Sequence, residues 1–404
     1  MRVRAFALLA ICALFVAACS QTPAAPTLPR SSVEARASGG AAASAQTAAA
    51  TVAPAARRTS AETAAPAPAA FNIGVPAGNA YNPESLALDA TRSLAYVFHS
   101  TSDQGVAVIA VVDLAAGQVT RLMPVGDKPL AVGRLLLTPD RQRLFLHDGS
   151  GRALWTVDAQ TGTAKQLLDS VREIALSEDG TLLFVARDAG LGAYAVVDLL
   201  AGKTAPQWQS ETAYSRLAAD GARLLAASVA DGAALTVFDM RTGTSVADAA
   251  LPDGAVALSP GPAGGWAALV NGDKPRLIRF DAALRPLGET EIPYAQDFAY
   301  DASSRRFVLG GSGYEGVGSN ARGYGVTLAI DAGDGTITQE TRWPTNSWPT
   351  AFFPWTDDRM LAFQAGGPAL LSVLQSGDLT VRSLIPMGAR VDDAVVAGDR
   401  MLSV

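Results

Sequence analysis

The sequence predicts an all-β protein built from repeated antiparallel units of four strands. A segment that ends in an aspartate and a glycine-closed turn recurs about every 40–50 residues, as in V-V-D-L-A-A-G at 111–117 and F-D-M-R-T-G at 238–243. Short apolar runs stand between turn-forming residues, which is typical of strands rather than helices. Charged residues make up 17% of the chain and hydrophobic residues 49%, as expected for a large buried core. A repeat of this length made of antiparallel strands indicates a β-propeller.

Each repeat is expected to contain the same four strands. An apolar run forms the first strand, a turn such as S-E-D-G at 177–180 follows, and a second apolar run comes next. A loop then leads to a third strand that is expected to end at a marker aspartate. The markers are Asp113, Asp158, Asp198, Asp239, Asp281 and Asp331. Aspartate can accept a hydrogen bond from the backbone two residues on, and glycine can take a positive φ, so both are interpreted as turn residues rather than catalytic ones.

The first strands of the repeats predict eight blades, with seven as the alternative. They are expected to begin at Leu86, Leu135, Ile174, Leu217, Val256, Phe298, Phe352 and Ala394. The last copy has room for only two strands, and residues 71–78 look like an orphan fourth strand. A last blade made from both chain ends would close the ring and remove its open edges. One degenerate copy counted in error would leave seven blades.

The repeats resemble those of the YVTN family of propellers. In that family a unit runs through an apolar strand, an S-P-D-G turn, a second apolar strand, V-I-D-x-x-T-G and a strand that ends in P-V-G. Here L-M-P-V-G at 122–126 and I-P-M-G at 385–388 match the last element. The resemblance covers roughly residues 71–404. It implies the fold but no particular activity, because such propellers host unrelated functions.

The N-terminus is typical of an export signal. Two arginines precede an apolar run, Ala5–Ala18, that is short for a bilayer span. The run ends in V-A-A-C at 16–19, which resembles the lipobox of bacterial lipoproteins. That resemblance implies cleavage before Cys19 and lipidation of its sulfur, and an ordinary signal peptide with a chance cysteine is the alternative. Cys12 would be removed with the signal, so the mature chain would have no disulfide.

The expected organisation is a signal peptide at 1–18, a lipidated cysteine with a tether at 19–70, and the propeller at 71–404. The tether is rich in Ala, Pro, Ser and Thr and has few large apolar side chains that could offset the entropy of ordering it. The protein is expected to be exported and anchored by lipid to the cell membrane or outer membrane, facing the periplasm or cell exterior. Without the signal and tether the net charge falls from −6 to −10, which disfavours nucleic-acid binding.

The residue before each first-strand run is expected at the mouth of the central channel. Antiparallel order places the starts of first strands and the ends of second strands on one face. The charged residues at these positions are Arg134, Glu173, Arg216, Asp297 and Asp393, and the neutral ones are Ser85, Ala255 and Ala351. Glu84, which stands beside Ser85, is a further charged candidate. Such a ring could bind a polar ligand, or a divalent cation through carboxylate oxygens, or it could be a mutually paired and solvated ring.

Both histidines, His99 and His147, are expected at matching second-strand ends in adjacent blades. The other blades carry polar residues at those places, and they are Arg187, Ser228, Asn271 and Gln364. A polar residue there is therefore a general feature of the repeat, and no metal site is expected.

The longest insertion is the glycine-rich segment 310–325, which is expected to be a loop. It is either a binding loop or a plain surface hairpin, and its candidate residues are Tyr314, Glu315, Asn320, Arg322 and Tyr324. Its G-S-G-Y-E-G matches the dinucleotide fingerprint, but no strand–turn–helix unit accompanies it. Three tryptophans follow, and they are expected to pack between blades or to form an aromatic patch: Trp343, Trp348 and Trp355.

These patterns favour a non-catalytic binding or scaffold module that needs no cofactor. No P-loop, H-E-x-x-H, G-x-S-x-G or C-x-x-C motif is present. The alternative is a hydrolase resembling propeller lactonases, in which Glu173, Asp297 and Asp393 would hold Ca²⁺ or another divalent cation. The ring lacks the asparagine of that family, and Asn271 is the nearest equivalent. A quinone-cofactor propeller is disfavoured because tryptophans do not recur in every blade.

A protein partner or a small ligand is expected on the channel-mouth face. The opposite face is expected to carry repeated turns with little variety of side chains.

Overall fold

The computed structural model describes residues 81–101, 107–125, 130, 132–228, 233–315, 322–343, 348–356, 358–365, 370–386, 394–397 and 400–403. Contacts divide the chain into Met1–Ala64 and Ala65–Val404, and every described residue belongs to the second unit. The predicted signal peptide, Cys19, the tether and the strand at 71–78 lie outside the described residues. Among the described residues, no helix is long and apolar enough to cross a membrane.

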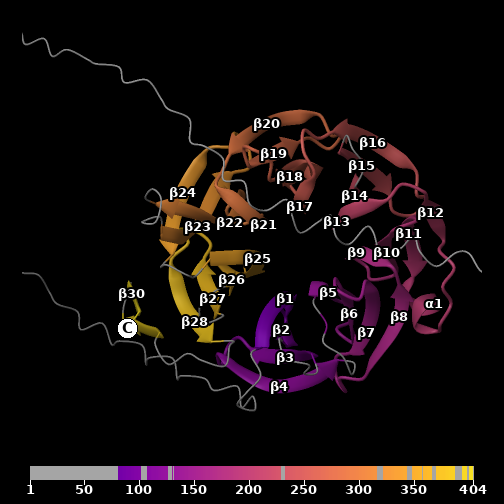
Figure 1. The fold of residues 1–404 in the computed structure, drawn as a ribbon, viewed down its shortest axis with the longest axis horizontal. Helices are drawn as coiled ribbons and strands as arrows, with labels where there is room; N and C mark the ends of the chain where they lie inside the picture. Colours follow the sequence, from indigo (N-terminus) through magenta and orange to yellow (C-terminus); the bar gives the residue numbers. More distant parts are fainter. Residues whose placement is uncertain are drawn as a thin grey trace, which may run out of the picture. The chain divides into compact units, whose positions relative to one another are not determined.

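Seven four-stranded antiparallel sheets, the blades, are arranged in a ring (Figure 1). Blade 1 consists of β1 (Tyr81–Asp89), β2 (Leu94–Thr101), β3 (Ala107–Asp113) and β4 (Gln118–Val125). Blade 2 consists of β5 (Val132–Leu137), β6 (Arg143–Asp148), β7 (Ala153–Asp158) and β8 (Ala164–Asp169). Blade 3 consists of β9 (Val171–Leu176), β10 (Leu182–Arg187), β11 (Gly190–Ala195) and β12 (Trp208–Ser210), with helix α1 (Val196–Leu200) between the last two strands. Blade 4 consists of β13 (Tyr214–Asp220), β14 (Arg223–Ser228), β15 (Ala234–Asp239) and β16 (Ser245–Ala250).

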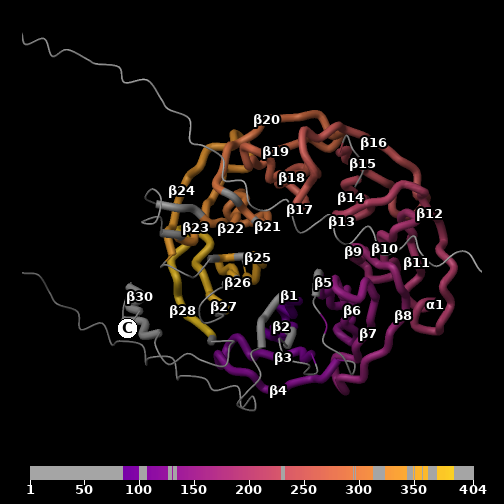
Figure 2. The backbone as a smooth tube through the Cα atoms, in the orientation of Figure 1, coloured from indigo at the N-terminus to yellow at the C-terminus, as the bar shows by residue number. Residues whose placement is uncertain are grey.

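The remaining blades repeat this order. Blade 5 consists of β17 (Ala255–Pro260), β18 (Trp266–Val270), β19 (Arg276–Phe280) and β20 (Pro286–Glu291), with a 3-10 turn (Pro262–Gly264) between the first two. Blade 6 consists of β21 (Tyr294–Asp301), β22 (Arg306–Glu315), β23 (Arg322–Asp331) and β24 (Ile337–Trp343). Blade 7 consists of β25 (Trp348–Thr356), β26 (Arg359–Ala365), β27 (Leu370–Gln375) and β28 (Val381–Pro386). The first strand of each blade is innermost, and the chain passes around the ring blade after blade (Figure 2).

The preferred count of eight blades is wrong, and the alternative of seven is correct. Blade 7 packs directly on blade 1, where Trp355, Leu361 and Leu371 meet Leu86 and Val97 in one buried cluster. The ring is therefore closed without a composite blade. The predicted eighth first strand at Ala394 is β29 (Ala394–Ala397), and among the described strands it pairs only with β30 (Arg400–Ser403).

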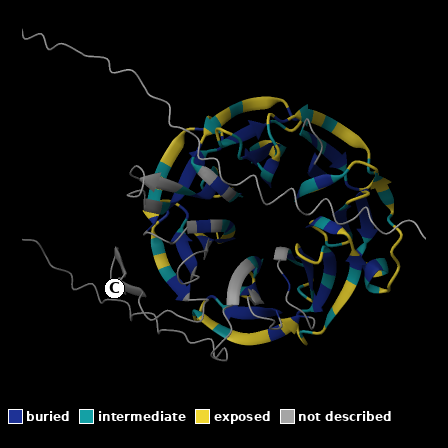
Figure 3. Cartoon of the chain, viewed as in Figure 1, coloured by how far each residue is buried: buried dark blue, intermediate teal, exposed yellow. Residues whose placement is uncertain are grey.

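The core is divided into seven hydrophobic clusters, and each one joins two neighbouring blades. Both faces of a blade are therefore buried, which explains why the second strands are continuous apolar runs instead of alternating ones. All five residues of β18 are buried, as are five of the six in β14. In the outer strands, exposed residues alternate with half-buried ones. The outer rim of the ring is therefore exposed to solvent (Figure 3).

The turn chemistry inferred for the markers is confirmed in five of the six repeats. In each of these, the marker's Oδ1 accepts the backbone N–H two residues on at 2.8–3.1 Å, at Asp113, Asp158, Asp239, Asp281 and Asp331. Gly117, Gly162 and Gly243 follow with φ of 64°, 77° and 71°. Such a φ is accessible to glycine without the clash that a Cβ causes.

Blade 3 departs from the prediction at Asp198, which lies in helix α1 instead of ending a third strand. Strand β11 pairs with the short β12 only through Leu191, Gly192 and Ala193. Residues 196–200 therefore have no outer strand to pair with, and a helical turn satisfies their backbone internally. One result is that Val197 is 74% exposed.

The turn glycines differ in what surrounds them, which gives a stability prediction. A Cβ on Gly243 would stand 2.5 Å from the indole of Trp208, and the Nε1 of that indole donates to the carbonyl of Met240 at 2.8 Å. A Cβ on Gly117 would meet nothing within 4 Å. We expect Gly243→Ala to lower the free energy of unfolding by at least about 1 kcal/mol more than Gly117→Ala, because both variants strain φ but only one crowds the blade 3–blade 4 contact. Urea denaturation measures the difference, and equal losses would contradict the explanation.

Candidate functional site

Each inner strand contains a β-bulge near its start. In six blades the register skips one inner-strand residue, for example between Val132 and Arg134 and between Tyr214 and Arg216. Blade 3 follows the same pattern, and there the skipped residue is Arg172. Bulges bend a strand and re-aim the side chains that follow. The residues that follow the seven bulges, here called the bulge ring, are Ser85, Arg134, Glu173, Arg216, Ala257, Asp297 and Ala351.

All seven bulge-ring residues line one cavity of about 560 Å³ at the inner strands. This volume lies in the usual range of small-molecule sites, roughly 300–1,000 Å³. Four of the predicted charged residues, Arg134, Glu173, Arg216 and Asp297, are thus brought together. The predicted blade 5 position, Ala255, is two residues too early, because its bulge places Ala257 at the cavity. Glu84 is the bulge residue of β1, and Asp393 lies outside the described residues.

Arg134 and Glu173 form a partly buried pair at the cavity. Nη1 of Arg134 is 3.7 Å from Oε1 of Glu173 and donates to the carbonyl of Leu217 at 2.8 Å. The Glu173 side chain is only 10% exposed, and its Oε1 also accepts the amide of Ile174 at 3.0 Å. Arg134 therefore connects blade 2 to both blade 3 and blade 4, and the two charges largely satisfy each other.

Arg216 and Asp297 line the same cavity without such a pairing. The guanidinium of Arg216 donates to the backbone carbonyls of Val256 and Ser215, and among the described residues neither Arg216 nor Asp297 has an oppositely charged group within 4 Å. Asp297 lines the cavity, and the rest of its surroundings are protein. This burial raises its pKa to about 6. The Phe298 amide and the charges of Arg134 and Arg216 act in the opposite direction. Asp297 is therefore mostly ionised at neutral pH.

The two histidines do not occupy matching places, in contrast to the prediction. His99 pairs with Pro83, whereas the equivalent residue of blade 2, opposite Val132, is Asp148. His147 pairs with Arg134 one position earlier, so the two imidazoles lie on opposite faces of their sheets. His147 lines the cavity, where its Nε2 donates to the carbonyl of Val171 at 3.1 Å. Burial lowers the pKa of both rings, to about 4 for His99.

Sequence reasoning missed one charged residue of the site. Arg172, the bulge residue of blade 3, lines the cavity and is held by Asp188, whose Oδ1 is 2.5 Å from its Nε. Arg152 binds the same carboxylate at 2.7 Å. His147 was expected on this face, and the structure shows in addition that it lines the cavity. The V-R-E segment at 171–173 carries two adjacent charges ahead of an apolar run, and this signal could have indicated Arg172.

The candidate loop at 310–325 is largely a strand hairpin. Strands β22 and β23 run through it, with Ser312 opposite Gly325 and Glu315 opposite Arg322. Tyr314 also lies in β22, and Tyr324 lies in β23 with the guanidinium of Arg342 4.6 Å from its ring centre. Asn320 lies outside the described residues. None of the described residues of this hairpin lines the cavity.

Two of the three tryptophans pack between blades. Trp343 belongs to the cluster of blades 6 and 7, and its Nε1 donates to Thr327 at 2.8 Å. Trp355 belongs to the cluster of blades 7 and 1. The packing interpretation is thus confirmed for this pair. Trp348 lies in β25.

The opposite face is more varied than predicted. A groove of about 1030 Å³ crosses blades 2–4 beside α1, and Val196, Val197 and Leu200 line it. Two of its carboxylates, those of Asp140 and Asp179, accept hydrogen bonds within their own turns. Asp179 accepts from Ser177 and Thr181. These charges are therefore less available to a ligand than Arg216 and Asp297.

Among the described residues, no three His, Cys, Asp or Glu side chains gather as they would around a metal ion. Glu173 and Asp297 share the cavity, but the third proposed ligand, Asp393, lies outside the described residues. The divalent-cation alternative stays a prediction.

The fold and this cavity define a seven-bladed β-propeller. No protein-family model and no curated protein matches the sequence. BamB from Moraxella catarrhalis is similar in structure, with 15% identity, 69% of this chain and 82% of that chain covered, and a TM-score of 0.48. A chain in the mitotic checkpoint complex shows 16% identity, 63% and 76% coverage, and a TM-score of 0.49. Similarities this weak do not indicate a function, and the resemblance to YVTN propellers stays a prediction.

Proposed function

We propose that this protein is an exported, lipid-anchored propeller that acts as a non-catalytic binding module through its bulge-ring face. The single observation that carries the binding role is the cavity, where seven equivalent positions converge and four hold charged side chains. Turn positions elsewhere use their polar groups on their own backbone. In the bulge ring, by contrast, one arginine and one aspartate have no charged partner within 4 Å among the residues that the structure describes.

Binding at this face is tested by photo-crosslinking in cells. A benzophenone amino acid at Arg172, whose side chain is 33% exposed beside the cavity, should give reproducible crosslinked products. The same amino acid at Arg241, an exposed residue at the opposite groove, is the matched control and should give none. Loss of the Arg172–Asp188 pair should affect folding little, because exposed ion pairs contribute little to stability. Products only from position 241, or from neither position, would contradict the proposal.

The anchor is tested separately through Cys19. The V-A-A-C segment at 16–19 supports lipidation at this sulfur. Cys19→Ala should abolish incorporation of a labelled fatty acid and release the protein from the membrane fraction, because an acyl chain is then absent. Cys12→Ala is the control and should change neither. Unchanged fractionation of Cys19→Ala would show that the chain is not anchored by this lipid.

A further inference from the structure

The cavity contains a cation and an anion that face the same space without neutralising each other directly. Arg216 on β13 and Asp297 on β21 both line it, and the charges of Arg134 and Arg216 lower the pKa of Asp297 against the effect of its burial. No ion pair within 4 Å joins either of them to a described residue. The other charged groups of the lining are engaged, Arg134 with Glu173 and Arg172 with Asp188.

Charges that are removed from water are normally paired, because an unpaired one costs free energy. A purely anionic ligand at Arg216 would bring a further negative charge towards the carboxylates of Asp297 and Glu173. A purely cationic ligand at Asp297 would meet Arg216 and Arg134. A ligand that carries both charges avoids either repulsion.

We propose that the cavity binds a small zwitterion of the α-amino-acid type, with its carboxylate on Arg216 and its ammonium on Asp297. This inference rests on the proposed binding function and specifies its ligand. A guanidinium can bind a carboxylate through two parallel hydrogen bonds, and only two of the Arg216 donor groups, Nε and Nη1, are used by backbone carbonyls. The carboxylate of Asp297 is an acceptor for an ammonium.

The rest of the lining favours an apolar side chain on the ligand. Leu86, Leu88, Leu217 and Phe353 contribute to the wall, and the cavity of about 560 Å³ is larger than the two charged groups alone need. Apolar surface on the ligand would therefore be buried against these residues, which stabilises binding. Leucine has both required features.

Calorimetry on the purified full-length chain tests the assignment. We expect saturable binding of leucine, identified within a panel of the twenty common amino acids. Two analogues separate its charges: 4-methylpentanoate lacks the ammonium, and 3-methylbutylamine lacks the carboxylate. Each should bind roughly 10–100-fold more weakly, the usual effect of losing a charge-assisted hydrogen bond. Equal binding of an analogue, or no binding by any amino acid, would overturn the proposal.

Substitutions assign the two charges to residues. Arg216→Gln and Asp297→Asn should each weaken leucine binding by roughly 10–100-fold, and Arg241→Gln on the opposite face should leave it unchanged. Arg216→Gln should lower the affinity for 4-methylpentanoate but not that for 3-methylbutylamine. Thermal melting shows whether the variants fold, and if one does not, the analogue series on the unaltered protein still decides. Crosslinks at position 172 without amino-acid binding would overturn this inference alone, whereas absence of both crosslinks and amino-acid binding would also remove the proposed function.

Discussion

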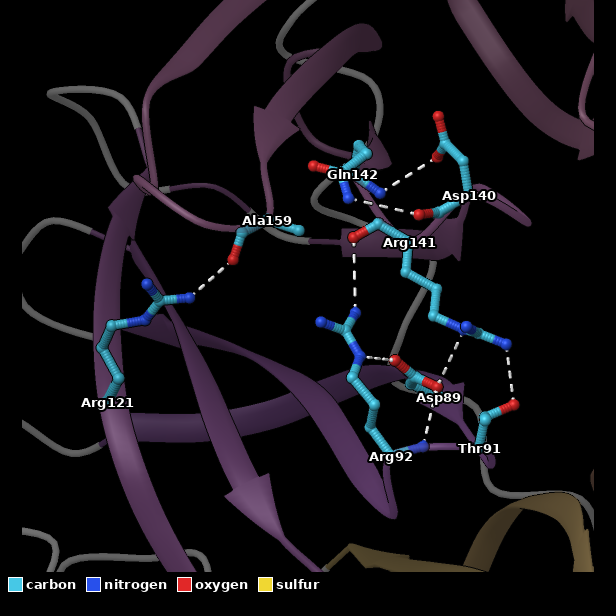
Figure 4. Close-up of polar contacts among 8 residues, drawn as sticks. All are labelled: Asp89, Thr91, Arg92, Arg121, Asp140, Arg141, Gln142 and Ala159. Atoms are coloured by element: carbon cyan, nitrogen blue, oxygen red, sulfur yellow. Dashed lines mark hydrogen bonds and ion pairs between the residues drawn. The ribbon is translucent and has the colours of Figure 1, made fainter.

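Asp89→Ala is expected to lower the free energy of unfolding by about 3 kcal/mol, because a buried carboxylate that serves two arginines would be lost. The Asp89 side chain is fully buried at the end of β1. It binds Arg92 of its own turn and lies 3.2 Å from Nε of Arg141 in blade 2 (Figure 4). Arg141 also donates to Thr91 at 2.7 Å, so this network joins blade 1 to blade 2.

The size of the stability loss in Asp89→Ala depends on the arginines that lose their partner. Without Asp89, two guanidiniums stand near each other with no carboxylate between them. Each arginine is 40–42% exposed, so water can partly replace the lost partner, and the value lies at the low end for a broken buried pair.

Urea denaturation of Asp89→Ala measures this loss. Lys203→Ala is the matched control, because it removes an ion pair whose side chains are 71% and 44% exposed, and no measurable change is expected. A change for Asp89→Ala as small as that of the control would show that the network does not hold the blades together.

Local patterns in the sequence predicted the turns correctly because the chemistry of a turn is local. An aspartate that accepts the amide two residues on needs no partner from another blade, and this arrangement is found at Asp113 and Asp239. The blade count depends instead on how the ring closes. The copy at Ala394 is similar in sequence to a first strand, but blade 7 already packs on blade 1.

Helix α1 shows the limit of local reasoning most directly. V-V-D-L-L-A-G at 196–202 differs from V-V-D-L-A-A-G at 111–117 in one residue, yet the first is helical and the second ends a strand and turns. Intrinsic propensity is a weak prior that tertiary context overrides. The context here is the outer strand: β4 pairs with β3 as far as Asp113, whereas β12 reaches only Ala193.

The cavity-lining position was predicted correctly in six of the seven blades, and only the blade 5 residue is displaced. Strand direction alone brings Arg134, Glu173, Arg216 and Asp297 to one face, and the structure places them around one cavity. The bulges are not visible in the apolar pattern, because one extra residue changes the facing of a strand without changing its composition. For this reason the apolar pattern predicts Ala255 instead of Ala257 in blade 5 and does not distinguish the positions of His99 and His147.

The titration of His99 is expected to lower the stability of the fold between pH 6.5 and about 4. Burial lowers the pKa of His99 from 6.5 to about 4 in the folded protein, so the unfolded chain binds the extra proton in this range. The contribution of His99 to stability is therefore complete above pH 6.5 and falls as the pH decreases, by roughly 3 kcal/mol at pH 4. His147 acts in the same direction.

Asp297 opposes this trend, because its pKa is raised from 3.8 to about 6. Between these values the folded protein binds the extra proton at Asp297, so lowering the pH favours folding at this group. Asp297→Asn should therefore make the acid-induced loss larger, whereas removal of His99 should make it smaller.

His99→Gln isolates the histidine contribution, because glutamine does not titrate and the chain itself has Gln364 at the equivalent position of blade 7. Free energies of unfolding in urea at pH 7.5 and 4.5 give the comparison. The loss of stability between pH 7.5 and 4.5 should be smaller by roughly 2.5 kcal/mol in His99→Gln, because the unfolded chain no longer gains a proton there. If His99→Gln and the unaltered protein lose the same stability on acidification, His99 is not the group that titrates, and its imidazole must already be able to take up a proton in the folded state.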